Sequence, residues 1–289
     1  MSRSSKLRNS LQSLFYGLPM PAGLRRRLLF AFFNRRMPHF SKPKTFNDKV
    51  NWRILNDRRP LLEWTCDKLL MKEHAMEAAL DGFHVPNTIW SGADVCELRN
   101  VELPEYWVLK PNHRSGLIYF GHGRPDPGEL SDVTAGWLDA SEWEHKGEWA
   151  YAKARPLLLV EELLGSPGCP PPDYKFFVFD GRAVAVQVDV DRHNAHRRRL
   201  YRRDWSPLDV RYGPYDLAPV MPPISNLARM LAVAERLGQP FDFIRVDLYD
   251  VDDIIEFGEF TPYPCGGLDR FVPPFLNLEL GKAWILPRL

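Results

Sequence analysis

The most constraining feature of this sequence is a pair of β-hairpins encoded in its second half. Lys175–Phe179 and Ala183–Asp189 alternate in polarity and are joined by an Asp-Gly pair at 180–181, the strongest short-range signal for a tight hairpin turn. Phe243–Tyr249 and Ile254–Phe260 form a second such pair across a short acidic stretch. Strands joined by a tight turn pair antiparallel, so the sequence predicts antiparallel sheet here.

Helical patterns dominate the first half of the chain. Polar capping residues at 45–48 precede apolar residues at helical spacing, and a second helix is expected over Asp67–Leu80. Another amphipathic helix is expected over Ile224–Leu237, ending at Gly238. Strand-like runs lie between these helices, at Thr88–Trp90, Tyr106–Lys110 and Leu157–Glu162. Helices first and hairpins later indicate an α+β fold with antiparallel sheet.

The second hairpin carries two carboxylates that alternation brings together. Arg245 and Asp247 share one face of their strand, and the same alternation puts Ile255, Phe257 and Glu259 on one face of the returning strand. With the turn centred near residues 251 and 252, Asp247 falls close to Glu259. Two carboxylates on one sheet face can hold Mg²⁺ while phosphates complete its coordination. Solvated acids, or a structural ion pair with Arg245, remain the alternatives.

Three further segments carry polar residues at strand ends. Lys110 leaves an apolar run and enters a small loop that contains Gly116, where a lysine and backbone N–H groups can hold phosphate. Glu161 and Glu162 close another strand, where backbone and acid can contact adenine and ribose. Lys175 opens the first hairpin beside them. An ordinary turn and solvated side chains are the alternatives for each segment.

Composition excludes several classes of protein. A net charge of +1 over 289 residues provides no global field for nucleic acid. The four cysteines form no CxxC pair, which argues against zinc and against a disulfide framework. No run of about 18 apolar residues is present, and no Ser/His/Asp or Cys/His arrangement is visible. A soluble cytoplasmic protein is expected.

Residues 1–45 stand apart from the rest. Leu11–Tyr16 and Leu24–Phe33 carry leucine and aromatic residues at helical spacing among clustered arginines. One interpretation is a helical hairpin that packs its apolar face on the domain and leaves its arginines in solvent. The other is an interfacial helix on anionic lipid, which would make the protein peripheral at the inner face of the membrane.

Taken in order, these segments resemble the TupA-like branch of the ATP-grasp superfamily, whose members are often labelled polysaccharide biosynthesis proteins or glycosyltransferases. The likeness covers about residues 40–285. The matching segments are Pro43–Trp52, Asp67-Lys68, Leu103-Pro104, Val108–His113, Val160–Leu164, Asp173–Phe177, Asp191-Arg192, Arg245–Tyr249, Phe257–Thr261 and Gly266-Gly267.

The resemblance implies an ATP-grasp fold in which two antiparallel-sheet lobes enclose ATP. It implies a helical N-terminal extension over residues 1–45 and an ATP-grasp domain over 46–289, with lobes over 46–160 and 161–289.

The resemblance also implies residue roles. Asp247 and Glu259 are the implied Mg²⁺ ligands. Lys175, Arg192 and Arg245 are the implied catalytic residues, with Lys175 and Arg192 facing the γ-phosphate or the acyl phosphate. The implied ATP contacts are Lys68, Lys110, His113, Ser115, Gly116, Glu161, Glu162, Leu164 and Asp173.

Two positions depart from the family pattern. Thr261 stands where most ATP-grasp proteins have an asparagine ligand, and Arg114 stands where the phosphate loop more often has glycine.

The implied activity is that of an ADP-forming ligase, which uses ATP and Mg²⁺ to activate a carboxylate as an acyl phosphate for attack by an amine. The expected partners are a uronic acid or amino acid, an amine, and membrane-associated machinery that assembles surface polysaccharide; no nucleic acid is expected. Two alternatives stay open. Asp189-Val190-Asp191 fits the DxD pattern of a glycosyltransferase that uses a nucleotide sugar, and the departures at Arg114 and Thr261 would suit a non-catalytic nucleotide-binding subunit.

Overall fold

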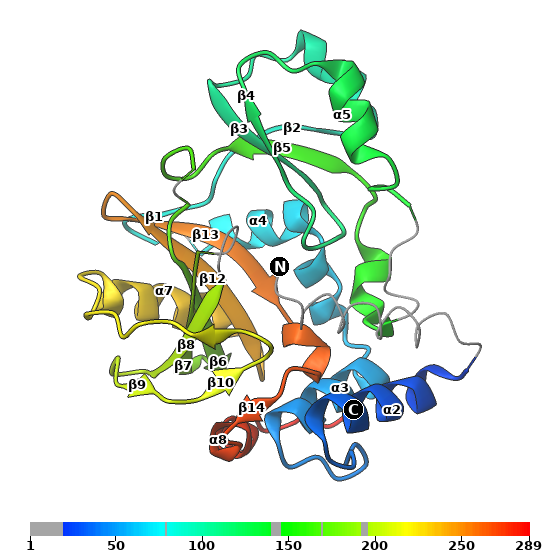
Figure 1. Ribbon diagram of the computed structural model, residues 1–289, viewed down its shortest axis with the longest axis vertical. Coiled ribbons are helices and arrows are strands. Elements are labelled where there is room, and N and C mark those ends of the chain that lie inside the picture. The colour runs from blue at the N-terminus through cyan, green and yellow to red at the C-terminus, as the bar shows by residue number, and fades with distance from the viewer. Residues whose placement is uncertain (1–19, 79, 140–145, 169, 192–195) are drawn as a thin grey trace.

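The structure, a computed structural model, describes residues 20–78, 80–139, 146–168, 170–191 and 196–289. Figure 1 shows a small sheet at one end of the molecule, a larger sheet in the middle, and a group of helices at the other end. Within the described residues, no helix is both long enough and apolar enough to cross a membrane.

The larger sheet has eight strands in the order β1-β13-β12-β6-β7-β8-β11, with β9 on β8. All neighbours are antiparallel except the edge pairs β1–β13 and β8–β11. A separate two-stranded ribbon joins β10 and β14. These strands are β1 (Phe83–His84), β6 (Asp173–Phe179), β7 (Arg182–Val190), β8 (Arg197–Arg202), β9 (Pro207–Leu208), β10 (Arg211–Tyr212), β11 (Asp216–Leu217), β12 (Ile244–Val251), β13 (Ile254–Thr261) and β14 (Phe271–Val272).

The smaller sheet is fully antiparallel, in the order β2-β5-β3-β4. Its strands are β2 (Thr88–Gly92), β3 (Tyr106–Pro111), β4 (Tyr119–His122) and β5 (Leu158–Glu162). One face is apolar: Trp107 and Leu109 of β3 pack with Leu130 of α5 (Pro127–Thr134). The other face carries Lys110 and Glu161, so alternation along these strands separates a core side from a polar side.

The other helices cover the larger sheet and its far end. These are α2 (Ala22–Asn34), α3 (Phe46–Asn56), α4 (Lys68–Met76), α7 (Leu227–Gly238) and α8 (Phe275–Ala283), with 3₁₀ turns η1 (Pro60–Leu62), η2 (Trp64–Cys66), η3 (Val95–Asn100), η4 (Trp149–Lys153) and η5 (Pro264–Gly267). Phe46 of α3 packs edge-on against Phe177 and Phe243, with ring centroids 5.5 and 5.0 Å apart. Because Phe177 shares its strand face with Lys175, one end of this sheet face is apolar and the other is polar.

Both predicted hairpins are confirmed. The turn residues Asp180 and Gly181 have φ of 45° and 75°, and Asp252 and Asp253 have φ of 51° and 64°. Two consecutive positive φ angles are typical of the type I′ turn, whose twist matches that of the flanking strands. The α+β class, the two antiparallel sheets and the helical N-terminal region are therefore as predicted, while the lobe boundary at 160/161 stays a prediction.

The predicted alternation along the last strand was wrong at one point. Asp247 lies opposite Glu259, but the next residue, Leu248, lies opposite Phe257, because a β-bulge falls at Gly258. The bulge puts Phe257 and Glu259 on opposite faces of the sheet. A side chain at Gly258 would meet the carbonyl oxygen of Asp247 at 2.8 Å, so only glycine fits there.

Helix α2 agrees in part with the packed interpretation of the N-terminal segment. Leu29 and Phe30 are fully buried, against Phe40 and Leu268. Arg26 is not in solvent as that interpretation expected: it is 1% exposed and donates to Oδ1 of Asn51 at 2.8 Å. The predicted helical segment Leu11–Tyr16 lies outside the described residues.

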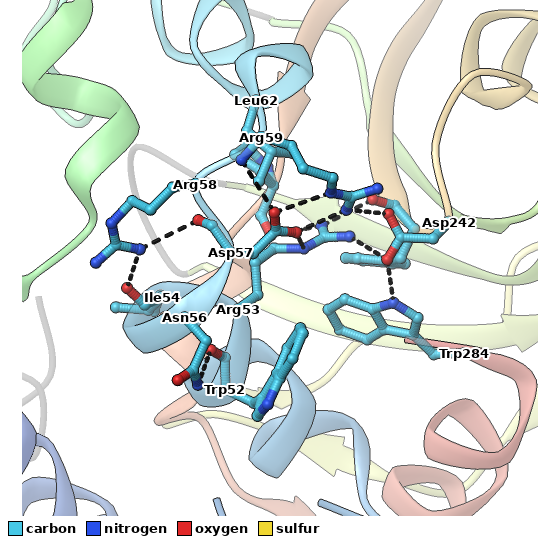
Figure 2. A network of polar contacts seen from close by, with 12 residues as sticks. Trp52, Arg53, Ile54, Asn56, Asp57, Arg58, Arg59, Leu62, Asp242 and Trp284 are labelled. Atoms are coloured by element: carbon cyan, nitrogen blue, oxygen red, sulfur yellow. Dashed lines mark hydrogen bonds and ion pairs between the residues drawn. The ribbon is translucent and has the colours of Figure 1, made fainter. Parts of the chain in front are cut away.

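A buried ion network joins the end of α3 to the start of β12 (Figure 2). Arg53 and Arg59 each donate to Asp242, at 2.7 and 2.6 Å, and Arg59 also donates to Asp57 at 2.6 Å. The indole N–H of Trp284 donates to Asp242 at 2.6 Å. The network fixes the position at which β12 enters the sheet.

Candidate functional site

The polar face of the larger sheet is organised around Lys175. Its Nζ donates to Oδ2 of Asp173 and to Oδ2 of Asp247, each at 2.5 Å. Asp173 lies two residues before Lys175 on β6, and Asp247 lies directly opposite Lys175 on β12. All three side chains are nearly inaccessible to solvent, so the charges can be held there only because they pair.

Arg245 extends this group to β13. It donates to both carboxylate oxygens of Asp247 at 2.7 and 2.8 Å, to Glu259 at 3.3 Å and to Oγ1 of Thr261 at 2.9 Å. The hydroxyl of Thr261 donates to Glu259 at 3.2 Å. The predicted residues Lys175, Arg245, Asp247 and Glu259 thus form one continuous group, and Thr261 belongs to it.

Burial governs the titration of Asp247. It raises the pKa of this carboxyl above its usual value, while Arg245 and Lys175 act in the opposite direction. The alternative of solvated acids on a surface hairpin is therefore wrong for Asp247, which is 1% exposed. Glu259 differs, since 36% of its side chain is accessible.

Asp247 and Glu259 supply carboxylate oxygens of the kind that Mg²⁺ binds, but only part of its coordination shell. The two residues are direct cross-strand partners, and carboxylate oxygens are ligands that Mg²⁺ prefers. Among the described residues, no three or more His, Cys, Asp or Glu side chains are grouped so that they could hold a metal ion. A cation here would therefore need further oxygen ligands from water or from phosphate.

The polar face of the smaller sheet holds a second charged group. Glu161 of β5 is 4% exposed and forms ion pairs with Lys110 of β3 and with Lys72 of α4. Lys72 also donates to Oγ1 of Thr88 at 3.0 Å. Burial alone would raise the pKa of Glu161, but Lys110 and Lys72 outweigh burial and hold this pKa below its usual value.

Lys72 is a candidate site residue that the sequence reasoning missed. It is 6% exposed, and burial lowers its pKa, an effect that Glu161 opposes. The available signal was its spacing from Lys68: residues four apart lie on the same side of a helix.

Lys68 supports the loop that follows β3. Its Nζ donates to the carbonyl oxygens of Pro111, Asn112 and Arg114 at 2.9, 3.3 and 2.5 Å. Oδ1 of Asn112 accepts from the backbone N–H of Leu69 at 2.9 Å. The start of α4 therefore anchors the expected phosphate loop, and direct contact of Lys68 with a nucleotide stays a prediction.

Lys68 of α4 interacts electrostatically with both charged groups. Burial lowers the pKa of Lys68 to about 8; Glu259 is the strongest influence that raises it, and Lys110 lowers it further. Lys68 therefore interacts with Glu259 of the larger sheet and with Lys110 of the smaller one. In Figure 1, α4 lies between the two sheets, which agrees with this position.

The remaining predicted nucleotide contacts lie around the smaller sheet. His113 is buried, and burial lowers its pKa, whereas Ser115 and Gly116 are exposed in the same loop. Gly116 has a φ of 81°, a conformation that favours glycine. Glu162 is exposed at the end of β5, and Leu164 is partly buried just beyond it. Their contacts with a nucleotide stay predictions.

The two acids of the DxD triplet lie in different environments. Asp189 is 2% exposed and accepts from Nε of Arg198 at 2.6 Å and from Gln187 at 2.8 Å. Asp191 is exposed, pairs with Arg197 at 2.7 Å and has a φ of 53°. Arg192, an implied catalytic residue, lies outside the described residues. Asp189 thus forms a salt bridge within the sheet, as Asp247 does with Arg245.

Comparison with known families gives one match over most of the chain. A family model described as TupA-like ATPgrasp matches residues 48–285. A search among curated proteins gives no match.

Solved structures give distant matches of fold. D-alanine–D-alanine ligase from Bacillus anthracis in complex with ATP is 14% identical, with a TM-score of 0.39 over 69% of this chain and 54% of that one. The enzyme of the same name from Helicobacter pylori is 14% identical, with a TM-score of 0.44 over 78% and 60%. L-amino acid ligase from Bacillus licheniformis is 11% identical, with a TM-score of 0.45 over 76% and 49%. The chain thus spans about half the length of these proteins.

Proposed function

The chain belongs to the TupA-like ATP-grasp family, and on this premise we propose that it is an ATP- and Mg²⁺-dependent ligase joining a carboxylate to an amine. The observation that carries the proposal is the meeting of two charged groups at α4. On one side Lys72 and Lys110 pair with the single carboxylate of Glu161, and Lys68 contacts the loop that follows β3. Asp247 and Glu259 lie on the other side and share Arg245. A triphosphate with its cation carries the complementary charges.

The lysines bind and orient the phosphates in this proposal. Lys72 and Lys110 each have three N–H donors, so they can bind phosphate oxygens while they remain paired with the buried carboxylate of Glu161. Lys68 keeps the loop at 112–116 in place, so that its backbone N–H groups can approach the same oxygens.

The larger sheet acts on the group that is transferred. Asp247 and Glu259 would hold Mg²⁺, which neutralises phosphate charge when it is bound. Lys175 and Arg245 orient these carboxylates and supply positive charge where negative charge develops. The γ-phosphoryl group passes to a substrate carboxylate with loss of ADP, and an amine then displaces phosphate from the acyl phosphate to form the amide. Positioning and charge neutralisation are sufficient for such chemistry, and no covalent nucleophile is needed.

We further propose that the carboxylate is a uronic acid or an amino acid and that the product enters a cell-surface polysaccharide. The support is the family resemblance to proteins of polysaccharide biosynthesis.

Isothermal titration of the purified protein with ATP and Mg²⁺ tests the nucleotide site, with UDP-sugars titrated in parallel. We expect Mg²⁺-dependent ATP binding that Asp247→Asn and Glu259→Gln each weaken by roughly tenfold or more. Asp209→Asn is the matched control, because it removes an acid that is 91% exposed and paired with Arg199. Binding of a UDP-sugar in place of ATP would overturn the proposal.

A second assay separates a ligase from a non-catalytic subunit. Release of ADP is measured with panels of uronic acids, amino acids and amines, and wild type is compared with Lys175→Met. ADP release that requires both a carboxylate and an amine supports ligation. Tight ATP binding with no release under any pairing would instead identify a nucleotide-binding subunit.

A further inference from the structure

Helix α2 presents apolar side chains to solvent as well as to the core. Leu24, Leu28 and Phe32 recur at every fourth residue and are 49%, 41% and 52% exposed. At 3.6 residues per turn, these three positions fall on one side of the helix. A helix on a soluble domain usually turns its charged face outward, so this side of α2 is unusual.

The inward side of α2 is the side that packs in the core. Leu29 and Phe30, on the inward side, are fully buried against Phe40 and Leu268. Four of the 14 large apolar residues that are exposed in the described part of the chain lie between positions 24 and 37, the fourth being Met37. Exposed apolar side chains gathered in this way mark an interaction surface more often than scattered ones do.

The N-terminal part of the sequence, which includes α2, carries formal charge of a single sign. Ten of the chain's 38 lysines and arginines fall within residues 1–47, and all 37 aspartates and glutamates lie after them. The first 47 residues therefore carry a formal charge of +10 and the remainder −9. Arg27 of α2 and Arg35, the residue that follows the helix, are exposed.

We propose that α2 docks on an anionic lipid surface. Leu24, Leu28 and Phe32 enter the boundary between headgroups and acyl chains, and Arg27 and Arg35 contact lipid phosphates. The segregated charge favours lipid: an anionic bilayer attracts the N-terminal segment, repels the acidic remainder, and so orients the molecule. The helix has 13 residues, a length of about 20 Å, which suits lying on a bilayer and is too short to span one.

The position of α2 leaves the candidate site accessible. Figure 1 shows α2 at the end of the molecule opposite the smaller sheet. Arg26 connects α2 to η5, the turn that follows β13, because its guanidinium donates to the carbonyl oxygen of Gly266. Docking would therefore hold the site at a fixed height above the bilayer.

Flotation of the full-length protein with vesicles tests the proposal. Vesicles of phosphatidylcholine alone are compared with vesicles of equal parts phosphatidylcholine and phosphatidylglycerol. We expect binding to the anionic vesicles that weakens as salt is added, and little binding to the neutral ones. Replacing Leu24, Leu28 and Phe32 by glutamine should lower the affinity by roughly a hundredfold. Replacing Arg27 and Arg35 by glutamine should lower it by roughly thirtyfold.

Matched controls remove equivalent groups far from α2. Val133→Gln with Val220→Gln removes exposed apolar side chains, and Arg99→Gln with Arg124→Gln removes two exposed charges. Neither pair should alter flotation, and all variants should unfold at the same temperature as wild type. Equal binding to both kinds of vesicle, or unchanged binding by the apolar variant, would refute lipid docking. A change in the monomer–dimer equilibrium of the apolar variant, without a change in flotation, would assign the surface to a second copy.

Discussion

Two networks of charged side chains in this molecule, the one in Figure 2 and the lysine group at Glu161, differ in how their charges are balanced. In the network of Figure 2, Arg53 and Arg59 are matched by Asp57 and Asp242, and Trp284 closes one side. In the lysine group at the smaller sheet, Lys72 and Lys110 share Glu161, and Lys68 donates hydrogen bonds to neutral carbonyl groups.

From this difference we infer that the network of Figure 2 stabilises the fold and that the lysine group can bind a ligand. A balanced and enclosed network offsets its own desolvation, and its function is complete once the chain has folded. In the lysine group, two cations, Lys72 and Lys110, share the single carboxylate of Glu161, and burial lowers the pKa of the neighbouring Lys68 to about 8. Such a group is suited to an anion, and a triphosphate is the anion that the family implies.

The largest expected effect comes from breaking the balanced network. Asp242→Ala leaves Arg53 and Arg59 without one of their carboxylates, and losing one partner of a buried ion pair typically costs about 3–5 kcal/mol. Urea unfolding measures this loss. Asp209→Ala, which removes an exposed partner of Arg199, is the control and should change stability by less than about 1 kcal/mol. A loss at Asp242 no larger than the control would contradict the structural role.

The lysine group should respond in the opposite way. Lys72→Met leaves the buried carboxylate of Glu161 with Lys110 as its remaining partner, so the free energy of unfolding should fall by less than in Asp242→Ala, while ATP binds roughly tenfold to a hundredfold more weakly. Isothermal titration and urea unfolding on the same preparation measure both quantities. Lys153→Met, at an exposed lysine of η4, should leave both unchanged. Lost stability with normal ATP affinity would reverse the comparison.

Acid titration examines the carboxylate of Asp67, which caps the start of α4 and pairs with Arg155. Burial would raise the pKa of Asp67, but hydrogen bonds from Arg155 and from the start of α4 lower it to about 2. The unfolded chain therefore takes up the proton first as pH falls. The resulting stabilisation, about 2 kcal/mol, is complete above the unfolded pKa of about 4 and is lost between pH 4 and pH 2.

Urea unfolding of wild type and Asp67→Asn across that range measures the contribution of Asp67. The difference between the two proteins should shrink as pH falls. A difference that stays constant with pH would show that Asp67 acts through its hydrogen-bond geometry alone.

The smallest expected effect concerns the departure at Thr261. Thr261→Asn supplies an amide oxygen beside Glu259, a better Mg²⁺ ligand than a hydroxyl, so the Mg²⁺ concentration needed for ATP binding should fall by about threefold. Titration of Mg²⁺ at fixed ATP measures this change, and Thr261→Val provides the control without an oxygen. Equal Mg²⁺ requirements for all three proteins would remove residue 261 from the metal site.

Much of the fold was accessible from local patterns. Both hairpins and the cap of α3 at Thr45 were predicted, because turn residues, alternation and capping act over a few neighbouring positions. The same reasoning brought Asp247 next to Glu259, which the register confirms.

The sequence by itself thus determined the class of fold, the hairpins and the carboxylate pair on the last of them. Only the tertiary structure decided which distant groups meet. Lys72 and Glu161 are separated by 89 positions and come together only when α4 packs beside the smaller sheet. The bulge at Gly258 and the burial of Arg26 also depend on neighbours that local spacing does not specify. Alternation and capping follow from covalent geometry along the chain, whereas ion pairs between elements follow from packing, which no short segment encodes.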